Sequence, residues 1–539
     1  MTALAPLNVF LTSSRIWLLA ALCLVALGVG QASLPITDRD EALFVQASRQ
    51  MVEDNAWVDI RFQDQPRYKK PVGIYWLQSM AARISGMQDQ APLWVWRLPS
   101  LFGAIATTLM VGWLGHRLWG AMTGAVSALL FASLFVVAGE ARIGTTDAVL
   151  MSLIVLCQIA LVQLAGLLPS GRGSVWLFWL ALGAAVLVKG PIAPMILAAT
   201  ILSWSVLQRD LSLLRALWQP WAVAACILIV LPWLVGITLI SGGAFWKEAV
   251  VQDLLSKVAS GQEGKGLPAG SYLLLLWISF WPASAVLPLS FAAIWRMRRD
   301  QRLQFLLCWL LASWIIFEMI PTKLFHYTMP LYPALVIMSV AAFLQATGRS
   351  GLLPRALSGL AVLVMAGVVT AVLLLQRQHA GGLDFTLLGA GLAAGLCGLA
   401  FWALWRDHRL VFLGALGLCG AVMNTALLLG LAHTPYLWPS TAAVQRAQAG
   451  AALRGCAAPS LVGWGFTEPS LVWLGGRDTL LLDQGQPLPA ALETDPCTVI
   501  VAEGPQPPAG YLSLSTLKGF AIGAGRPVTL QLYQPEVPQ

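Results

Sequence analysis

The amino-acid sequence predicts a mostly helical protein that crosses a membrane many times and ends in a small soluble α/β domain. Hydrophobic residues make up 58% of the 539-residue chain, and charged residues only 11%, well below the roughly 25% found in soluble domains. The apolar residues gather in runs of about 20, the length that spans about 30 Å of hydrocarbon. From residue 432 onward these runs stop, and short strand-like segments alternate with Gly, Pro and Asp turns.

About thirteen apolar segments are long enough to be membrane spans. The break at Lys189-Gly190-Pro191 leaves open whether the flanking segments are two spans or one kinked helix. We therefore expect a transmembrane helical domain over residues 1–431. The predicted spans lie near residues 15–34, 94–115, 119–138, 148–168, 174–188, 190–208, 219–240, 270–293, 303–320, 327–346, 356–375, 385–405 and 410–431.

The basic residues indicate how the bundle is oriented. Positive charges concentrate in the cytoplasmic loops of membrane proteins. That rule predicts a cytoplasmic N-terminus and a periplasmic C-terminus, and it explains the formal net charge of +8 without a nucleic-acid partner. The loops that this orientation places in the cytoplasm contain Arg117, Arg172, Arg209, Arg215, Arg296, Arg298, Arg299, Arg302, Arg349, Arg355, Arg406 and Arg409.

The tail, residues 432–539, reads as a separate periplasmic α/β domain of about a hundred residues, a usual domain size. The runs SLVGWG, SLVWLGG, TVIVAEG and VTLQLYQ are strand-like, and the run that begins at Ala442 reads as a helix. Cys456 and Cys497 are the two cysteines of the tail. In an oxidising periplasm they either form a disulfide or stay free, because the sequence does not give their separation.

The first external loop, residues 36–93, carries eight of the 25 acidic residues and seven of the 33 basic residues. Asp40 and Glu41 near its start, and Lys69 and Lys70 farther on, look like two halves of a site. The apolar residues that follow Glu41 recur at helical spacing, which predicts an amphipathic helix lying at the interface. A structural alternative exists for each half, because carboxylates favour the first turn of a helix and lysines anchor span ends.

Other polar residues stand at the outer ends of predicted spans. Glu140, Arg142 and Asp147 share the segment EARIGTTDAVL, whereas Lys189 and Lys323 are isolated. The predicted topology puts all of them on the same side as the first external loop. A second external loop, residues 241–270, shares that face. Taken singly, such residues are more typical of helix caps and interfacial anchors than of ligands.

The order of these residues resembles the motif order of the superfamily of aminoarabinose transferases and protein O-mannosyltransferases. Members of that superfamily are glycosyltransferases of the GT-C fold. The similarity runs from about Ile36 to Pro333, and the tail segment EPSLV, residues 468–472, resembles the periplasmic domain of the aminoarabinose branch. Order and spacing together make short motifs more specific. The motifs are Asp40-Glu41, Trp57, Tyr68-Lys69-Lys70-Pro71, Tyr75-Trp76, Asp147, Lys189-Gly190-Pro191, Lys323-Leu324, Tyr327 and Pro330.

The resemblance implies transfer of a sugar from a polyprenyl phosphate to an acceptor such as lipid A or another glycolipid, on the periplasmic face of a bacterial inner membrane, by a monomeric enzyme. It implies that Asp40 is the main catalytic carboxylate, with Glu41 beside it and Asp147 as a second acidic residue. Negative charge on the leaving phosphate calls for fixed cations. The residues expected to contact donor phosphate or substrate are Lys70, Lys69, Lys189, Lys323, Tyr327, Arg142 and Tyr68.

The role of Asp40 depends on the acceptor. A hydroxyl acceptor requires a general base within about 3 Å, which acts in a single inverting displacement. A phosphate acceptor, as on lipid A, is already ionised, and Asp40 would then orient it or stabilise positive charge on the sugar. The sequence leaves both roles open.

Two positions depart from the aminoarabinose branch. That branch usually has Arg two residues after the Asp-Glu pair and Glu before the Lys-Pro pair, where this chain has Leu43 and Lys69. The glutamate of that branch, which this chain lacks, looks like a metal ligand. No zinc and no other cofactor is therefore predicted, although binding of a divalent metal is left open. These departures bear on the sugar and the acceptor more than on the reaction type.

Three other functions compete with this one: transfer to Ser or Thr of proteins, non-enzymatic transport of a lipid-linked sugar, and a scaffold whose tail binds a periplasmic partner. Transporters tend to place ionisable groups near the middle of the bilayer. Here nearly every charge lies in a loop or at a span end, with Glu318 and the break at Lys189 the nearest exceptions. This distribution favours an enzyme that works at the interface.

Overall fold

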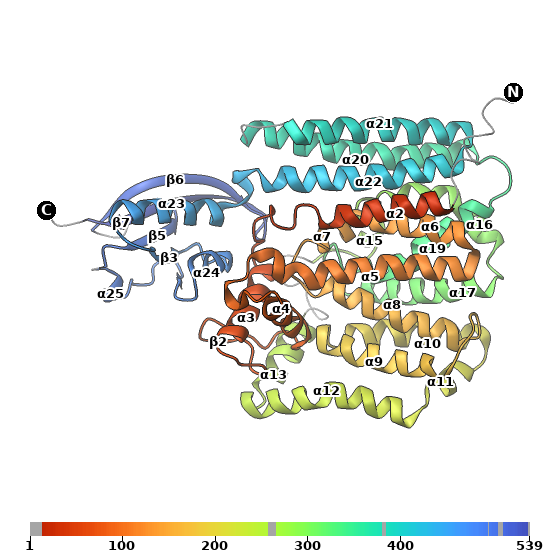
Figure 1. The fold of residues 1–539 in the computed structure, drawn as a ribbon, viewed down its shortest axis with the longest axis horizontal. Helices are drawn as coiled ribbons and strands as arrows, with labels where there is room; N and C mark the ends of the chain where they lie inside the picture. Colours follow the sequence, from red (N-terminus) through yellow and green to blue (C-terminus); the bar gives the residue numbers. More distant parts are fainter. Residues whose placement is uncertain (1–12, 257–265, 380–383, 494, 505–509, 537–539) are drawn as a thin grey trace.

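The computed structural model describes residues 13–256, 266–379, 384–493, 495–504 and 510–536. Each of the thirteen predicted spans corresponds to a helical segment, and the long helices run side by side in one bundle (Figure 1). Within these ranges, eight helices are long and apolar enough to cross a membrane. They are α5 (Leu93–Trp119), α8 (Asp147–Leu164), α9 (Arg172–Lys189), α12 (Pro220–Ser241), the run of α17 (Gln301–Leu307), η5 (Cys308–Ala312) and α18 (Ser313–Met319), α20 (Leu352–His379), α21 (Asp384–Arg406) and α22 (Arg409–Ala432).

The other predicted spans are bent or short. One is bent by 109° between α15 and the helical segment Ala283–Arg296, where Pro282 interrupts the helical hydrogen bonding. The remaining spans are helices of fewer than 18 residues. The elements are α15 (Ser271–Ser279), η4 (Ala283–Val286) and α16 (Leu287–Arg296) for the bent span, then α2 (Ser13–Gly28), α6 (Ala121–Ala132), α10 (Ile192–Gln208), and η6 (Met329–Leu331) with α19 (Tyr332–Gln345).

The break at Lys189-Gly190-Pro191 separates two helices. Helix α9 ends at Lys189 and α10 begins at Ile192. Gly190 between them has a φ of 61°, a left-handed conformation that glycine adopts without steric cost. Pro191 then lacks the backbone N–H that a continuous helix would need. The ammonium group of Lys189 is thereby left at the outer end of α9.

The first external loop folds into two helices joined by a hairpin. Helix α3 packs its apolar residues on two sides, because Phe44 and Met51 join the core of the bundle while Val45 and Val52 form a second cluster with Trp473 of the tail. The predicted helix is therefore present, but it lies between two parts of the protein and not on the membrane surface alone. The elements are α3 (Asp40–Glu53), β1 (Arg61–Phe62), β2 (Gln65–Pro66), α4 (Gly73–Ile84) and η1 (Gln88–Gln90).

Close backbone packing sets α4 against the end of α9. A Cβ atom on Gly73 would lie 2.7 Å from the carbonyl oxygen of Leu187, so only glycine fits there. This contact brings Lys70, just before α4, to the same region as Lys189. The second external loop contributes α13 (Ala244–Trp246) and the π-helix η2 (Lys247–Leu255), and its residues 257–265 lie outside the described part of the chain.

The tail contains a five-stranded sheet with the order β4-β3-β5-β7-β6. Strand β3 pairs in parallel with β4 and β5, whereas β7 pairs antiparallel with β5 and β6. Cys456 and Cys497 form a disulfide, with their Cα atoms 5.8 Å apart, which settles the alternative left open by the sequence. The elements are η7 (Pro435–Leu437), α23 (Pro439–Leu453), β3 (Ser460–Trp464), α24 (Ser470–Gly475), β4 (Leu480–Leu482), α25 (Ala490–Glu493), β5 (Thr498–Glu503), β6 (Tyr511–Ala521) and β7 (Arg526–Pro535).

One predicted strand of the tail is wrong. The run SLVWLGG forms the helix α24. Its apolar residues pack against two parts of the protein. Leu471 packs in the core of the tail, while Trp473 packs edge-on against Trp96 of α5, with ring centroids 6.2 Å apart. A short apolar run does not distinguish a strand from a helix until its neighbours are known.

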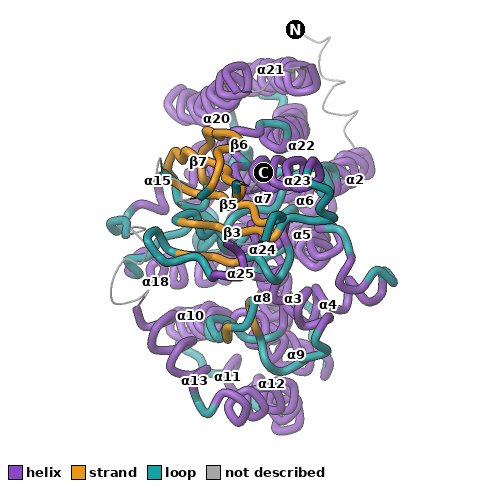
Figure 2. The backbone as a smooth tube through the Cα atoms, turned by 90° about the vertical axis from the view of Figure 1, so that its left-hand side faces the viewer, coloured by secondary structure: helices purple, strands orange, loops and turns teal. Residues whose placement is uncertain are grey.

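The tail docks onto the external loop at one end of the bundle. Figure 2 looks onto that end and shows the strands in front of α5, α6, α7 (Phe135–Glu140) and α22, with α12 at the bottom of the view, away from the strands. The guanidinium of Arg477 donates to Asp54, at distances of 2.8 and 3.0 Å, just after α3. The side-chain amide of Gln63 donates to the carbonyl oxygens of Arg477 and Thr479. Glu468 lies 3.9 Å from Arg39.

We expect this docked interface to weaken as the pH rises. Burial, and then the nearby carboxylate of Asp38, raise the pKa of Glu468 from 4.5 to about 7. A carboxyl group with a raised folded pKa stabilises the fold below pH 4.5, and this contribution is lost as the pH rises through about 7. Thermal unfolding of the full chain should therefore occur at a lower temperature at pH 8 than at pH 5, and Glu468→Gln should reduce that difference. An unchanged difference in the variant would contradict the assignment.

Candidate active site

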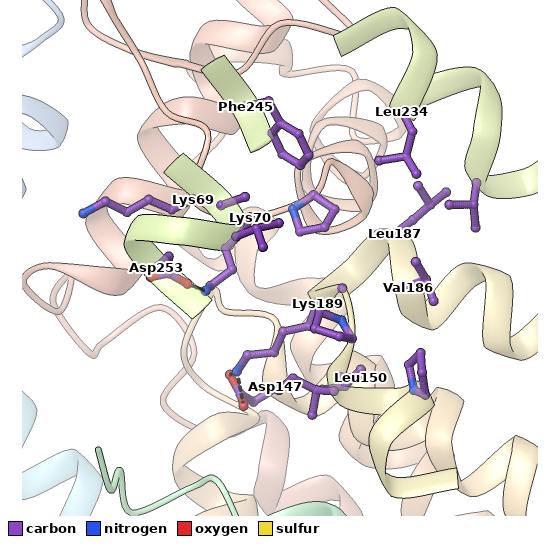
Figure 3. A pocket seen from close by; sticks show the side chains of 18 of the residues that line it. Lys69, Lys70, Asp147, Leu150, Val186, Leu187, Lys189, Leu234, Phe245 and Asp253 are labelled. Carbon is purple, nitrogen blue, oxygen red and sulfur yellow. Dashed lines mark hydrogen bonds and ion pairs between the residues drawn. The ribbon is translucent and has the colours of Figure 1, made fainter. Parts of the chain in front are cut away.

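A cavity of about 460 Å³ lies between the external loop and helices α8, α9 and α12. Its deeper wall is apolar, and its outer end carries Lys70, Asp147, Lys189, Asp253 and Tyr327. Figure 3 shows Lys70 and Lys189 reaching toward the cavity from opposite sides, with their acidic partners beside them. Residues that form the apolar wall include Leu150, Val186, Leu187, Val230, Trp233 and Leu234.

Two ion pairs fix the cations of this outer end. The ammonium group of Lys189 donates to both carboxylate oxygens of Asp147, at 2.6 and 2.8 Å. It also lies 5.8 Å from the centre of the Tyr327 ring. Lys70 donates to Asp253 of η2, with Nζ 2.5 Å from Oδ2. Both ammonium groups line the cavity, where a positive charge suits a phosphate group.

Asp253 and His326 belong to this cluster but were missed by the sequence analysis. The ring of His326 lies with Nδ1 3.3 Å from Glu140 and Nε2 3.7 Å from Asp147. His326 directly precedes Tyr327, so its place beside a motif residue was a usable signal. Asp253 carried no such signal, because it lies 183 residues from Lys70 in the chain.

Asp40 is exposed at the first residue of α3. No hydrogen bond or ion pair to another described residue occupies its carboxylate, unlike that of Glu41. Asp40 is not among the residues that line the cavity, but its charge acts on two tyrosines nearby. Burial raises the pKa of Tyr75, and the negative charge of Asp40 raises it further. Burial and the carboxylates of Asp147 and Asp40 likewise raise the pKa of Tyr327, in the loop between α18 and η6.

Glu41 occupies a different environment from Asp40. Its side chain and that of Arg97 are both 0% exposed, and they form an ion pair with Nε 2.7 Å from Oε1. Its carboxylate also accepts hydrogen bonds from the backbone N–H groups of Thr37 and Gly144. Arg97 in turn donates to the carbonyl oxygens of residues 31, 34 and 35. With its oxygens engaged and away from the cavity, Glu41 has the geometry of a structural residue, in contrast to the catalytic role expected from the sequence.

Two of the expected phosphate ligands are turned away from the cavity. Arg142 is fully buried and donates to the carbonyl oxygens of Ala26 and Val29 at the end of α2, and to that of Ala138. Lys323 is 4% exposed and donates to the carbonyl oxygens of Glu318 and Ile320. Both cations satisfy carbonyl groups at helix ends, and neither is among the residues that line the cavity.

Tyr68 and Lys69 flank Lys70 but differ in their surroundings. The hydroxyl of Tyr68 donates to Asp59, 2.9 Å away, and its ring packs edge-on against Phe245. Burial and that hydrogen bond raise the pKa of Tyr68 to about 12. Lys69 is exposed at the mouth of the cavity, and Figure 3 shows it pointing away from the centre. Tyr68 therefore does not line the cavity but supports Phe245, which does, whereas Lys69 adds positive charge at the entrance.

The donor set at this site does not fit a metal ion. Among the described residues, no group of three His, Cys, Asp or Glu side chains is arranged to hold a metal.

Comparisons with known proteins agree with this geometry. The family described as dolichyl-phosphate-mannose-protein mannosyltransferase matches residues 69–235. The undecaprenyl phosphate-alpha-4-amino-4-deoxy-L-arabinose arabinosyl transferase of Erwinia tasmaniensis is 27% identical over 405 residues, which cover 71% of this chain and 72% of that protein. Its counterpart in Pseudomonas aeruginosa strain LESB58 is 28% identical over 383 residues, which cover 68% and 67%.

Two solved structures share the fold. ArnT from Cupriavidus metallidurans, bound to undecaprenyl phosphate, superposes with a TM-score of 0.73 at 18% identity, covering 97% of this chain and 98% of that one. The oligosaccharyltransferase of Archaeoglobus fulgidus in its apo form gives a TM-score of 0.53 at 12% identity, covering 88% and 64%.

These superpositions show the GT-C fold. Together with the apolar helices and the similarity to the two transferases above, they indicate a multi-pass membrane glycosyltransferase. Within that class, the chain is similar to the aminoarabinose transferases, at 27% and 28% identity, and its residues 69–235 match the protein mannosyltransferase family.

We expect Lys70→Met to reduce sugar transfer by roughly 10²–10³-fold, the range seen when a charge-stabilising donor is removed. The reason is that Lys70 is a cation at the outer end of the cavity, where the leaving phosphate would gain negative charge. Initial rates in membranes that contain equal amounts of protein measure the effect. Lys518→Met, at an exposed position of β6, is the matched control. Equal rates for the two variants would exclude Lys70 from the phosphate site.

Proposed function

We propose that this protein transfers a sugar from an undecaprenyl-type phosphate to lipid A on the periplasmic face of the inner membrane. The observation that carries the proposal is the division of the cavity. A long apolar wall suits an isoprenoid chain, and two lysines at its outer end suit the phosphate. The relatives from Erwinia and Pseudomonas, whose names specify undecaprenyl phosphate and aminoarabinose, support the same donor and the same class of reaction.

In the mechanism that we infer, Lys70 and Lys189 bind the phosphate and stabilise its charge as it leaves the sugar. Asp147 is a positioning residue, because its carboxylate holds Lys189 through two hydrogen bonds. Asp40 faces the sugar or the acceptor from the start of α3. With a phosphate acceptor it orients that group or stabilises positive charge on the sugar, and with a hydroxyl it accepts the proton.

Transfer to Ser or Thr of proteins is the second candidate, and the match of residues 69–235 to the protein mannosyltransferase family favours it. Mass spectrometry of lipid A, other envelope glycans and secreted proteins, from cells with and without the intact chain, separates the two candidates. A sugar that appears on lipid A only with the intact chain supports the first candidate. The same change confined to proteins would replace it with the second.

We also propose that the N-terminus is cytoplasmic and the tail periplasmic. The support is that Arg117, Arg296 and Arg409 all lie at helix ends opposite to the end that carries the sheet, as the bias of positive charge toward the cytoplasm predicts. A cysteine placed at the exposed position Thr529 should react with a membrane-impermeant reagent in intact spheroplasts. Reaction only after lysis would reverse the orientation.

A further inference from the structure

The tail segment EPS, Glu468 to Ser470, has no role in the mechanism above, yet it touches the residues just before Asp40. The hydroxyl of Ser470 hydrogen-bonds to the carboxylate of Asp38. The hydroxyl of Ser440 lies 3.5 Å from the same oxygen of Asp38 and 2.6 Å from the hydroxyl of Ser470. Ser470 is completely buried. The tail therefore holds the loop at a point two residues from Asp40.

The backbone between Asp38 and Asp40 has a conformation that its own residues do not favour. Arg39 occupies the N-cap position of α3 with φ 64° and ψ −100°, and no side chain caps the helix there. Ser, Thr, Asp and Asn with extended backbone are the usual N-caps, and a left-handed φ is uncommon for a residue other than glycine. Such a conformation persists only when the surrounding structure holds it.

The tail also fits against this turn sterically. A Cβ atom on Gly523, in the turn between β6 and β7, would lie 3.1 Å from Cγ of Arg39 and 3.2 Å from Cβ of Asp38. Glu468 lies 3.9 Å from the guanidinium of Arg39. The turn is thus enclosed from the tail side by backbone, hydroxyl groups and a carboxylate.

The membrane domain holds the other side of the same turn. Glu41, the residue after Asp40, is locked to Arg97 of α5 and to the backbone N–H of Thr37. Asp38 is therefore held by the tail, and Glu41 is held by the bundle. Asp40 lies between them in the chain and is exposed.

We propose that the tail is a positioning element of the active site, which acts through the contacts of Ser470 and Ser440 with Asp38 to set the direction of Asp40. This inference rests on the proposed role of Asp40. The lysines that bind the donor phosphate lie on other elements, before α4 and at the end of α9. Loosening the tail contact should therefore reduce turnover while donor binding is preserved.

The double variant Ser440→Ala with Ser470→Ala tests this in the full chain. We expect turnover to fall roughly tenfold or more, because a misplacement of about 1 Å costs up to about 10²-fold. The number of undecaprenyl phosphate molecules bound per protein and their affinity should equal those of the unmodified chain. Hydrogen exchange in the peptide over residues 37–43 should rise, because the amide of Leu43 bonds the carbonyl of Arg39 at 2.9 Å.

Two further variants keep the test decisive. Thr529→Ala removes an exposed hydroxyl from β7 of the same domain and should leave turnover unchanged. Asp38→Asn keeps a side-chain oxygen that accepts from the two serines, and it should retain turnover within about threefold of the unmodified chain. Rescue by this conservative change separates a hydrogen-bonding role from a charge effect.

Two results would overturn the inference. One is turnover of the double-serine variant equal to that of Thr529→Ala. The other is a fall in turnover matched by an equal loss of donor-binding sites, which would indicate general unfolding. Asp40→Asn, assayed in parallel, keeps the two proposals apart. An active Asp40→Asn variant contradicts the catalytic role itself, whereas an inactive Asp40→Asn with a fully active double-serine variant contradicts the positioning role alone.

Discussion

Replacing Asp40 with Asn is expected to lower the rate of sugar transfer by roughly 10²–10⁴-fold, the range attributed to a positioned acid or base. Asn has nearly the same shape as Asp but lacks its negative charge, so it neither accepts a proton nor stabilises positive charge on the sugar. Asp40 is exposed, and no described residue pairs with its carboxylate. The fold should therefore tolerate the change. Transfer measured from a purified lipid-linked donor, normalised to folded protein, is the decisive assay.

Asp64→Asn is a matched control for that variant. Asp64 stands on the hairpin of the same external loop, and its side chain is 92% exposed. Loss of its charge should leave the transfer rate and the amount of protein unchanged. If Asp40→Asn retains full activity, or if the two variants lose activity equally, the catalytic assignment fails.

Replacing Arg97 with Met should have the largest effect on stability. It would leave the carboxylate of Glu41 buried without its cation, and breaking a buried ion pair in this way costs about 3–5 kcal/mol. Both side chains are 0% exposed, so water does not compensate for the loss. We expect a lower thermal unfolding temperature in detergent and less protein in the membrane.

A second substitution separates pairing from packing. Combining Arg97→Met with Glu41→Gln removes the unpaired charge, and much of the lost stability should return, because a neutral side chain is less costly to bury. Arg61→Met is the control, since the pair that Arg61 forms with Asp59 is exposed on the arginine side and exposed pairs contribute about 0–1 kcal/mol. If Arg97→Met is as stable as this control, Glu41 is not the structural residue that its contacts indicate.

Much of the fold was predictable because hydropathy is a local property. The spans, the helix after Asp40 and the soluble tail each follow from runs of neighbouring residues. The prediction failed where the side chains of one apolar run pack against two different parts of the protein. The segment SLVWLGG resembles a strand, but it is the helix α24, because its apolar side chains divide between the tail and α5.

The candidate site was predictable in part. The motif order pointed to Lys70, Asp147, Lys189 and Tyr327, and all four line the cavity. It also pointed to Glu41 as a catalytic residue and to Arg142 and Lys323 as phosphate ligands, although their contacts are with a buried arginine and with backbone carbonyl groups. A charged residue at a span end has the same sequence signature whether it caps a helix or faces a ligand.

By itself, the sequence determined the class of this protein: a membrane bundle with a charged loop, a small α/β tail and the motif order of a lipid-phosphate glycosyltransferase. Only the tertiary structure decided which charges face the cavity. The partners that decide it are remote in the chain, since Glu41 pairs with a residue 56 positions away, Lys70 with one 183 away and Asp38 with one 432 away. An ion pair depends on distance in space, and local patterns do not report that distance.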